Sequence, residues 1–141
     1  MTGKVFVDSK VLIYAHDKDA GSKQARAAQR LGELWETGLG RLSTQVLQEF
    51  YVNVTAKIGK PLSRSAAREV VQSYGRWVEN FITPVTVVRA SEISEIWQLS
   101  FWDSMIVATA EQDGAAELLS EDLSHGQTIA GVRISNPFVV A

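Results

Sequence analysis

The chain has 141 residues, of which 45% are hydrophobic, and this length and composition predict one compact domain over residues 1–141. Its 14 Lys and Arg against 16 Asp and Glu give a net charge of −2, which excludes the broad basic surface of a protein that holds nucleic acid by charge alone. The absence of cysteine excludes disulfides, thiolate zinc sites and cysteine catalysis, and because no apolar run approaches the roughly 20 residues of a membrane span, we expect a cytoplasmic protein.

Strands and helices are predicted to alternate along the chain. The first half reads as a strand at 4–7, a short apolar segment at 11–14, a helix at 22–37, a strand at 41–43, a helix from 45 to about 58 capped by Thr44, and a helix from 64 to about 77 capped by Ser63. The second half reads as a strand at 81–85, helices at 87–99 and 102–112, and strands at 117–120 and 132–135. Pro84 restricts the strand at 81–85 to an edge or a strand end. This alternation predicts a three-layer α/β/α fold with a mostly parallel sheet of about five strands.

Four carboxylates are predicted to meet at one edge of that sheet. Asp8 directly follows the first strand and Asp122 closely follows the strand at 117–120, and the carboxyl ends of parallel strands form the edge where ligands bind. Asp103 lies in the first turn of its helix on the side that would be buried, and Glu49 borders the apolar face of a helix leaving the same edge. A buried carboxylate is costly unless it is paired or binds a metal. Oxygen ligands without cysteine or an adjacent histidine favour Mg²⁺ or Mn²⁺ over zinc.

Each of these acids also has an ordinary structural explanation. Asp8 and Asp103 could cap the helices that they begin. Asp122 could be a turn residue, and Glu49 could be a solvated residue on the flank of its helix. The prediction of a metal site therefore depends on the coincidence of all four at one edge.

Four segments of the sequence resemble the signature blocks of the PIN-domain family, especially those of VapC-type toxins. In family order, they are VFVDSKVLIYAHD at 5–17, STQVLQEFYVNVT at 43–55, SFWDSMIVATA at 100–110 and LLSEDLSHG at 118–126. The resemblance covers essentially the whole chain. It implies that Asp8, Glu49, Asp103 and Asp122 are the catalytic acids, with Asp8, Asp103 and Asp122 on the metal, and it selects Asp122 over Glu121. Ser9, Thr44 and Ser120 become polar neighbours that could position a ligand, water or phosphate.

The resemblance also implies an activity and partners. Members of this family are metal-dependent endoribonucleases in which a metal-activated water attacks the phosphodiester and leaves 5′-phosphate and 3′-hydroxyl ends. We therefore expect Mg²⁺ or Mn²⁺ as cofactor, RNA as substrate, a homodimer, and a small antitoxin whose tail enters the active site.

Lys10 departs from the family pattern, which usually has asparagine at this position. If its ammonium turns inward, it competes with the metal, and if it turns outward, it offers RNA phosphate a contact at the pocket rim. We expect the outward orientation. Lys10 also keeps open an alternative, a PIN fold that binds RNA or protein with weak or no catalysis. It argues against a phosphatase of the haloacid-dehalogenase type, which would need aspartate at position 10.

The aromatic residues Trp97, Phe101 and Trp102 allow two interpretations. They could stack RNA bases, or they could pack in the core or at a dimer interface. Aromatic residues at helical spacing more often pack, and we expect packing here.

Overall fold

The computed structural model describes residues 3–139 and contains a five-stranded sheet in the order β2-β1-β3-β5-β4. The strands are β1 (Val5–Val7), β2 (Gly40–Arg41), β3 (Glu117–Leu119), β4 (Thr128–Ile129) and β5 (Val132–Ser135). Pairs β1–β2, β1–β3 and β3–β5 are parallel, and β4 pairs antiparallel with β5. The predicted α/β fold with a mostly parallel, five-stranded sheet is confirmed.

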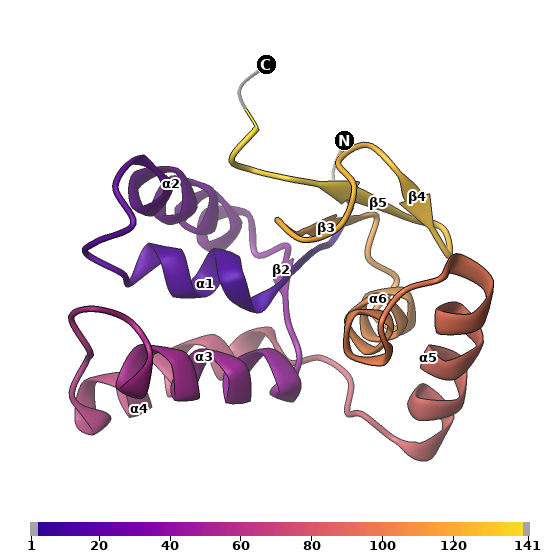
Figure 1. Ribbon diagram of the computed structural model, residues 1–141, viewed down its shortest axis with the longest axis horizontal. Coiled ribbons are helices and arrows are strands. Elements are labelled where there is room, and N and C mark those ends of the chain that lie inside the picture. The colour runs from indigo at the N-terminus through magenta and orange to yellow at the C-terminus, as the bar shows by residue number, and fades with distance from the viewer. Residues whose placement is uncertain (1–2, 140–141) are drawn as a thin grey trace.

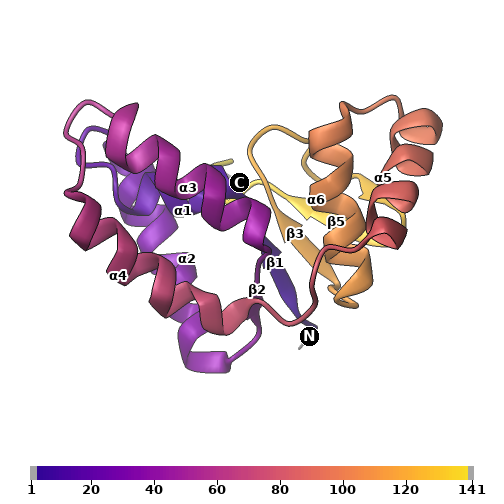
Figure 2. The same cartoon turned by 90° about the horizontal axis from the view of Figure 1, so that it is seen from below.

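Helices lie on both sides of this sheet (Figures 1 and 2). One side has α1 (Ser9–Ala15), α2 (Ser22–Thr37), α3 (Thr44–Ala56) and α4 (Arg64–Tyr74), and α4 continues into the 3-10 turn η1 (Gly75–Trp77). The other side has α5 (Pro84–Trp97) and α6 (Phe101–Gln112). Across residues 3–139, none of these helices combines the length and the apolar character needed to cross a membrane.

Strand β1 lies between β2 and β3 and is buried along its whole length. Phe6 and Val7 are fully buried, and burial of each such side chain contributes on the order of 2 kcal/mol to folding. The ladder continues one residue beyond the strand, because the Asp8 amide donates to the Leu119 carbonyl at 3.0 Å. The first predicted acid is therefore held by the centre of the sheet rather than by a free loop.

The predicted strand at 81–85 is wrong, because helix α5 begins inside it at Pro84. The fixed φ of proline suits the first position of a helix, where no amide hydrogen is needed. Thr83 is the N-cap, and its amide donates to Thr86 Oγ1 at 3.1 Å, which is half of a capping box built from threonine instead of glutamate.

Strand β4 was not predicted from the sequence. It is joined to β5 by the two-residue turn Ala130-Gly131, in which both residues have positive φ, 51° and 81°. Such turns usually have the sequence Asn-Gly or Asp-Gly. Alanine at the first position is not typical of them, so the sequence did not predict this turn.

The cap of α3 also differs from the prediction. Ser43 rather than Thr44 is the N-cap, since Ser43 Oγ accepts a hydrogen bond from the Val46 amide at 3.3 Å. Both residues are good caps, so the sequence alone does not choose between adjacent hydroxyls.

Candidate active site

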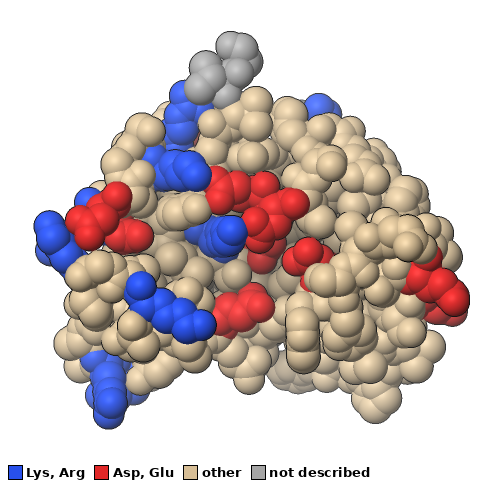
Figure 3. All heavy atoms as spheres, viewed as in Figure 1, with Lys and Arg blue, Asp and Glu red and all other residues tan. Residues whose placement is uncertain are grey.

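A hollow of about 240 Å³, here called the acidic pocket, opens beyond the carboxyl ends of β1 and β3. Figure 3 shows acidic side chains gathered at the centre of this face, with basic side chains among and beside them. The residues of the pocket come from the start of α1, from α3, from α6 and from the segment after β3, and they are Asp8, Ser9, Lys10, Ile13, Glu49, Asn53, Trp102, Asp103, Ile106 and Asp122. The fold thus brings all four acids singled out in the sequence to the same pocket.

Asp8 is the most deeply placed of the four acids, with 7% of its surface exposed. It is the N-cap of α1, and its Oδ1 accepts a hydrogen bond from the Ser9 amide at 2.7 Å. Its Oδ2 accepts one from the buried Ser120 hydroxyl at 3.1 Å. Asp8 therefore caps α1 and also lines the acidic pocket, and the Ser120 hydroxyl holds its second carboxylate oxygen.

The pKa of Asp8 is raised to about 6. Burial is the main cause, and the negative charges of Glu49 and Asp103 add to it, while the hydrogen bonds from Ser9 and Ser120 oppose the rise. The protein itself thus stabilises the ionised form of Asp8 less than water does. A cation bound in the pocket would stabilise that ionised form.

Helix α3 presents Glu49 and Asn53 to the pocket from positions one turn apart. Asn53 Nδ2 donates to the Glu49 carbonyl at 2.8 Å, so its side chain is held on the same face of the helix as Glu49. Asn53, four residues after Glu49, was not predicted to belong to the site. Its amide is a polar group that sequence reasoning left out, and the four-residue spacing from Glu49 is the signal that could have found it.

Asp103 lies in the first turn of α6, as predicted. Ser100, not Asp103, is the N-cap of this helix, and its Oγ accepts a hydrogen bond from the Asp103 amide at 3.1 Å. The Asp103 carboxylate therefore does not cap the helix, and it lines the acidic pocket. The positive end of the helix stabilises it by at most about 1 kcal/mol.

Lys10 does not take the outward orientation that we expected. Its Nζ donates to Asp122 Oδ1 at 2.7 Å, which places the ammonium on one of the four acids. This hydrogen bond is the main cause of a raised pKa for Lys10. The two side chains remain 46% and 43% exposed, so the pair lies at the mouth of the pocket and not in its depth.

Glu121, the neighbour of Asp122, is engaged elsewhere. Its Oε1 accepts a hydrogen bond from the Tyr14 hydroxyl at 2.7 Å, and its Oε2 forms an ion pair with Lys23. Glu121 is absent from the lining of the acidic pocket, whereas Asp122 belongs to it. This placement agrees with the choice of Asp122 from the sequence.

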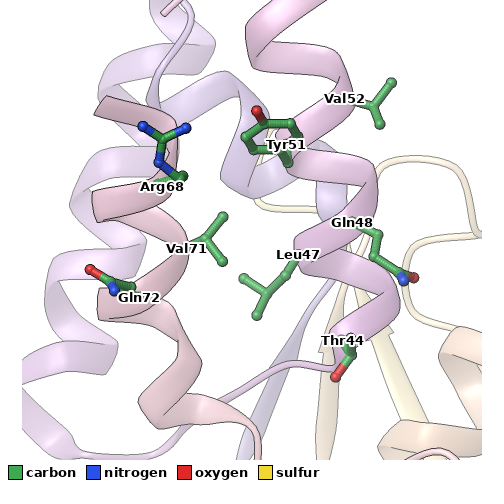
Figure 4. Close-up of a pocket in the computed structure, with 8 residues that line it drawn as sticks. All are labelled: Thr44, Leu47, Gln48, Tyr51, Val52, Arg68, Val71 and Gln72. Atoms are coloured by element: carbon green, nitrogen blue, oxygen red, sulfur yellow. The ribbon is translucent and has the colours of Figure 1, made fainter. Parts of the chain in front are cut away.

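Thr44 is the one predicted polar neighbour that lies away from the acids. It is exposed and contributes to a larger hollow of about 470 Å³ between α3 and α4, here called the α3–α4 groove (Figure 4). In Figure 4, α3 and α4 face one another across this groove, which is lined by Thr44, Leu47, Gln48, Tyr51, Val52, Arg68, Val71 and Gln72. Thr44 therefore lies on the side of α3 that faces the groove, and its predicted role beside the acids stays a prediction.

Trp102 lines the acidic pocket and is 64% exposed. Phe101 packs edge-on against it, with ring centroids 5.2 Å apart. Phe101 therefore packs as expected, whereas the indole of Trp102 is exposed at the mouth of the acidic pocket.

The donors of the pocket fit a hard divalent cation in their chemistry. Every acidic group there is a carboxylate, and no cysteine or histidine lines it. Within residues 3–139, however, no three His, Asp or Glu side chains approach closely enough to form a ready metal-binding group. Binding a cation would thus require rotation of some of these side chains, which the partly exposed Glu49, Asp103 and Asp122 can undergo.

The PIN domain family model matches residues 5–128, which include all four acids. No curated protein matches the sequence significantly. The fold resembles several solved structures. One is a toxin–antitoxin complex from Klebsiella pneumoniae, with a TM-score of 0.69 and 17% identity, covering 97% of this chain and 100% of the other.

Two further structures share the fold. FitAcB from Neisseria gonorrhoeae gives a TM-score of 0.61 at 15% identity, covering 96% of this chain and 99% of the other. VapC20 from Mycobacterium tuberculosis, described as a toxin that cleaves the sarcin–ricin loop, gives 0.57 at 18% identity, covering 84% and 90%. At these identities the likeness establishes a common fold.

Proposed function

This chain belongs to the PIN domain family, and from that premise we propose that it is a metal-dependent endoribonuclease and the toxin of a type II toxin–antitoxin pair. The observation that carries the proposal is the acidic pocket, in which Asp8, Glu49, Asp103 and Asp122 meet from four separate segments of the chain. The names of the solved structures support it, since one is a toxin–antitoxin complex and another is an RNA-cleaving toxin. We propose that it acts on RNA in the cytoplasm.

The chemistry would be hydrolysis of a phosphodiester by water. A bound Mg²⁺ or Mn²⁺ would lower the pKa of that water and offset the charge of the phosphate. By the resemblance to the family, Asp8 and Asp103 would hold the cation, and both line the pocket. We assign to Glu49, which reaches the pocket from α3, the acceptance of the proton from water at its carboxylate.

The supporting groups fix Asp8 rather than contact the substrate. The Ser9 amide and the Ser120 hydroxyl hold both carboxylate oxygens of Asp8 in place. The sequence assigned Asp122 to the metal as well, but its Oδ1 accepts a hydrogen bond from Lys10, so its role differs from that of Asp8 and Asp103.

The test is cleavage of structured RNA by the purified protein in Mg²⁺ or Mn²⁺. We expect cleavage that EDTA abolishes, that Asp8→Asn reduces on the order of 100-fold or more, and that leaves 5′-phosphate ends. Asp19→Asn is the matched control, since it removes an exposed carboxylate outside the pocket. Cleavage that persists through both EDTA and Asp8→Asn would overturn the proposal. RNA binding without any cleavage would favour the alternative of a binding module.

An antitoxin is part of the proposal. A small protein encoded beside this gene should suppress RNA cleavage when the two are expressed together, since the acids and the mouth of the pocket offer a carboxylate-rich site to a basic side chain. A neighbouring protein that binds but leaves cleavage unchanged would contradict the toxin–antitoxin assignment and leave the nuclease assignment standing.

We also propose a homodimer, for which the surface of α5 is the candidate interface. Val85, Val88 and Ile96 are 77%, 62% and 66% exposed, and an apolar surface of this kind on one helix is typical of a protein interface. Light scattering should show a dimer for the natural chain and a monomer for Val88→Asp. A natural chain that is already monomeric at micromolar concentration would contradict this assignment.

A further inference from the structure

Lys10 occupies a position that helix α1 alone does not favour. Asp8 is the N-cap of α1 and Ser9 its first residue, so Lys10 lies in the first turn. A cation near the positive end of a helix is unfavourable. The compensating interaction is with Asp122, in the segment after β3, at 2.7 Å from Lys10 Nζ to Oδ1.

The ion pair separates Asp122 from the other acids in function. Asp8 accepts hydrogen bonds from two uncharged groups, the Ser9 amide and the Ser120 hydroxyl. Asp122 instead has a cation of its own, supplied by the chain.

The position of the Lys10 ammonium on Asp122 favours one divalent ion over two. Among the residues that the structure describes, the acidic pocket is lined by four carboxylates and one ammonium, and by no other Lys or Arg. One divalent ion together with Lys10 leaves the pocket slightly negative when all the acids are ionised. A second ion on Asp122 would have to approach within a few ångströms of the ammonium, where the two positive charges repel each other strongly even at the effective dielectric of a protein surface.

We propose that Lys10 is a built-in cation at Asp122 that takes the place of a second divalent ion, so that the pocket binds one ion, held by Asp8 and Asp103. This inference rests on the proposed metal dependence. It assigns Lys10 a positioning role, and it removes Asp122 from the metal ligands while keeping it in the pocket.

The test counts bound ions and needs no substrate. Mn²⁺ is titrated into the full-length protein, with heat measured by calorimetry and free Mn²⁺ by electron paramagnetic resonance. The natural chain should bind one Mn²⁺. Lys10→Asn and Lys10→Met should each bind a second, and Lys18→Met, which removes an exposed lysine outside the pocket, should still bind one.

Asp122→Asn identifies where the second ion goes. In the natural background it should leave the single ion in place, because Asp122 is not a ligand there. In the Lys10→Asn background it should weaken the second ion by tenfold or more. Thermal melts of every variant establish that each is folded before its ions are counted.

The outcomes separate this inference from the proposed function. If the natural chain binds two ions, or if the Lys10 variants still bind one, the role given to Lys10 is wrong and metal dependence stands. If no variant binds Mn²⁺, the metal dependence fails and this inference fails with it.

Discussion

Helix α3 separates two hollows of very different character. On one side Glu49 and Asn53 face the acidic pocket of about 240 Å³, and on the other Leu47, Gln48 and Tyr51 face the α3–α4 groove of about 470 Å³. The groove is the larger, but none of its lining residues is acidic and Arg68 is its single charged one. The smaller hollow has the groups that can bind a cation and move a proton.

The difference shows that the ability of a hollow to bind a cation depends on the charged groups that line it and not on its volume. Both hollows depend on the helical period, since residues 48 and 49 are adjacent in sequence and about 100° apart around the helix axis. Glu49 and Gln48 therefore offer a direct way to test the comparison, by moving one carboxylate from one side to the other.

The largest effect is expected from exchanging these two residues. The double substitution Gln48→Glu with Glu49→Gln keeps composition and net charge, but it moves the carboxylate from the acidic pocket to the groove. We expect RNA cleavage to fall on the order of 100-fold or more, because the proposed proton acceptor is lost. Single-turnover cleavage at saturating Mg²⁺ measures it.

Gln48→Glu alone is the control for the exchange. It adds a carboxylate to the exposed side of α3 and should leave cleavage near its natural rate. If the double variant were as active as the natural chain, Glu49 would have no part in the reaction.

Much of the fold and most of the site could be predicted from the sequence. The period of the apolar residues indicates α2, α3 and α6, and the alternation of elements indicates a parallel sheet. The four acids follow from the resemblance and from the rule that strand ends share an edge. These inferences succeed because they depend on local spacing and on a general property of parallel sheets.

The wrong predictions concern features of the structure that the local spacing of residues does not determine. Thr44 and Ser43 are equally good caps, and the choice of Ser43 turns Thr44 toward the groove. The orientation of Lys10 depends on Asp122, which is 112 residues away in the chain. The segment at 81–85 has strand-like residues, but proline and threonine at its end begin a helix.

The second prediction concerns the loss of folding stability that results from burying ionised Asp8 in the acidic pocket. Its folded pKa of about 6 lies above the ordinary 3.8, so the folded protein binds more protons than the unfolded chain between these values. Stability contributed by protonated Asp8 is therefore lost as pH rises from about 4 to about 6. In EDTA at pH 8 Asp8→Asn should raise the free energy of unfolding by up to about 3 kcal/mol.

The pH dependence distinguishes this cause from a general effect of the substitution. Between pH 8 and pH 5 the advantage of Asp8→Asn over the natural chain should shrink by about 1 kcal/mol, because Asp8 becomes protonated in the natural chain. Urea unfolding at the two pH values measures the difference, in which the titration of all other groups cancels. A constant difference across this range would show that burial does not raise the pKa of Asp8.

The third prediction addresses the groove side of α3. Leu47 is nearly buried between α3 and α4, and Leu47→Ala should lower the free energy of unfolding by about 2 kcal/mol through lost packing. Cleavage per folded molecule should not change, because the groove has no part in the proposed reaction. A selective loss of cleavage in a variant that is still folded would make the groove part of the active site.

The smallest effect is expected from the aromatic residues on the two sides. Trp102 is exposed at the mouth of the acidic pocket, where its indole can stack on a base of bound RNA, and Tyr51 lines the groove. Trp102→Ala should weaken RNA binding by about 1 kcal/mol, roughly fivefold, at the lower end of the range for stacked bases because the indole is largely solvated. Tyr51→Ala should leave RNA affinity unchanged. Fluorescence anisotropy with labelled single-stranded RNA, in Ca²⁺ to prevent cleavage, measures both. Equal losses from the two variants would mean that RNA contacts α3 on both of its sides, and the division between a chemical and a structural face would then not hold.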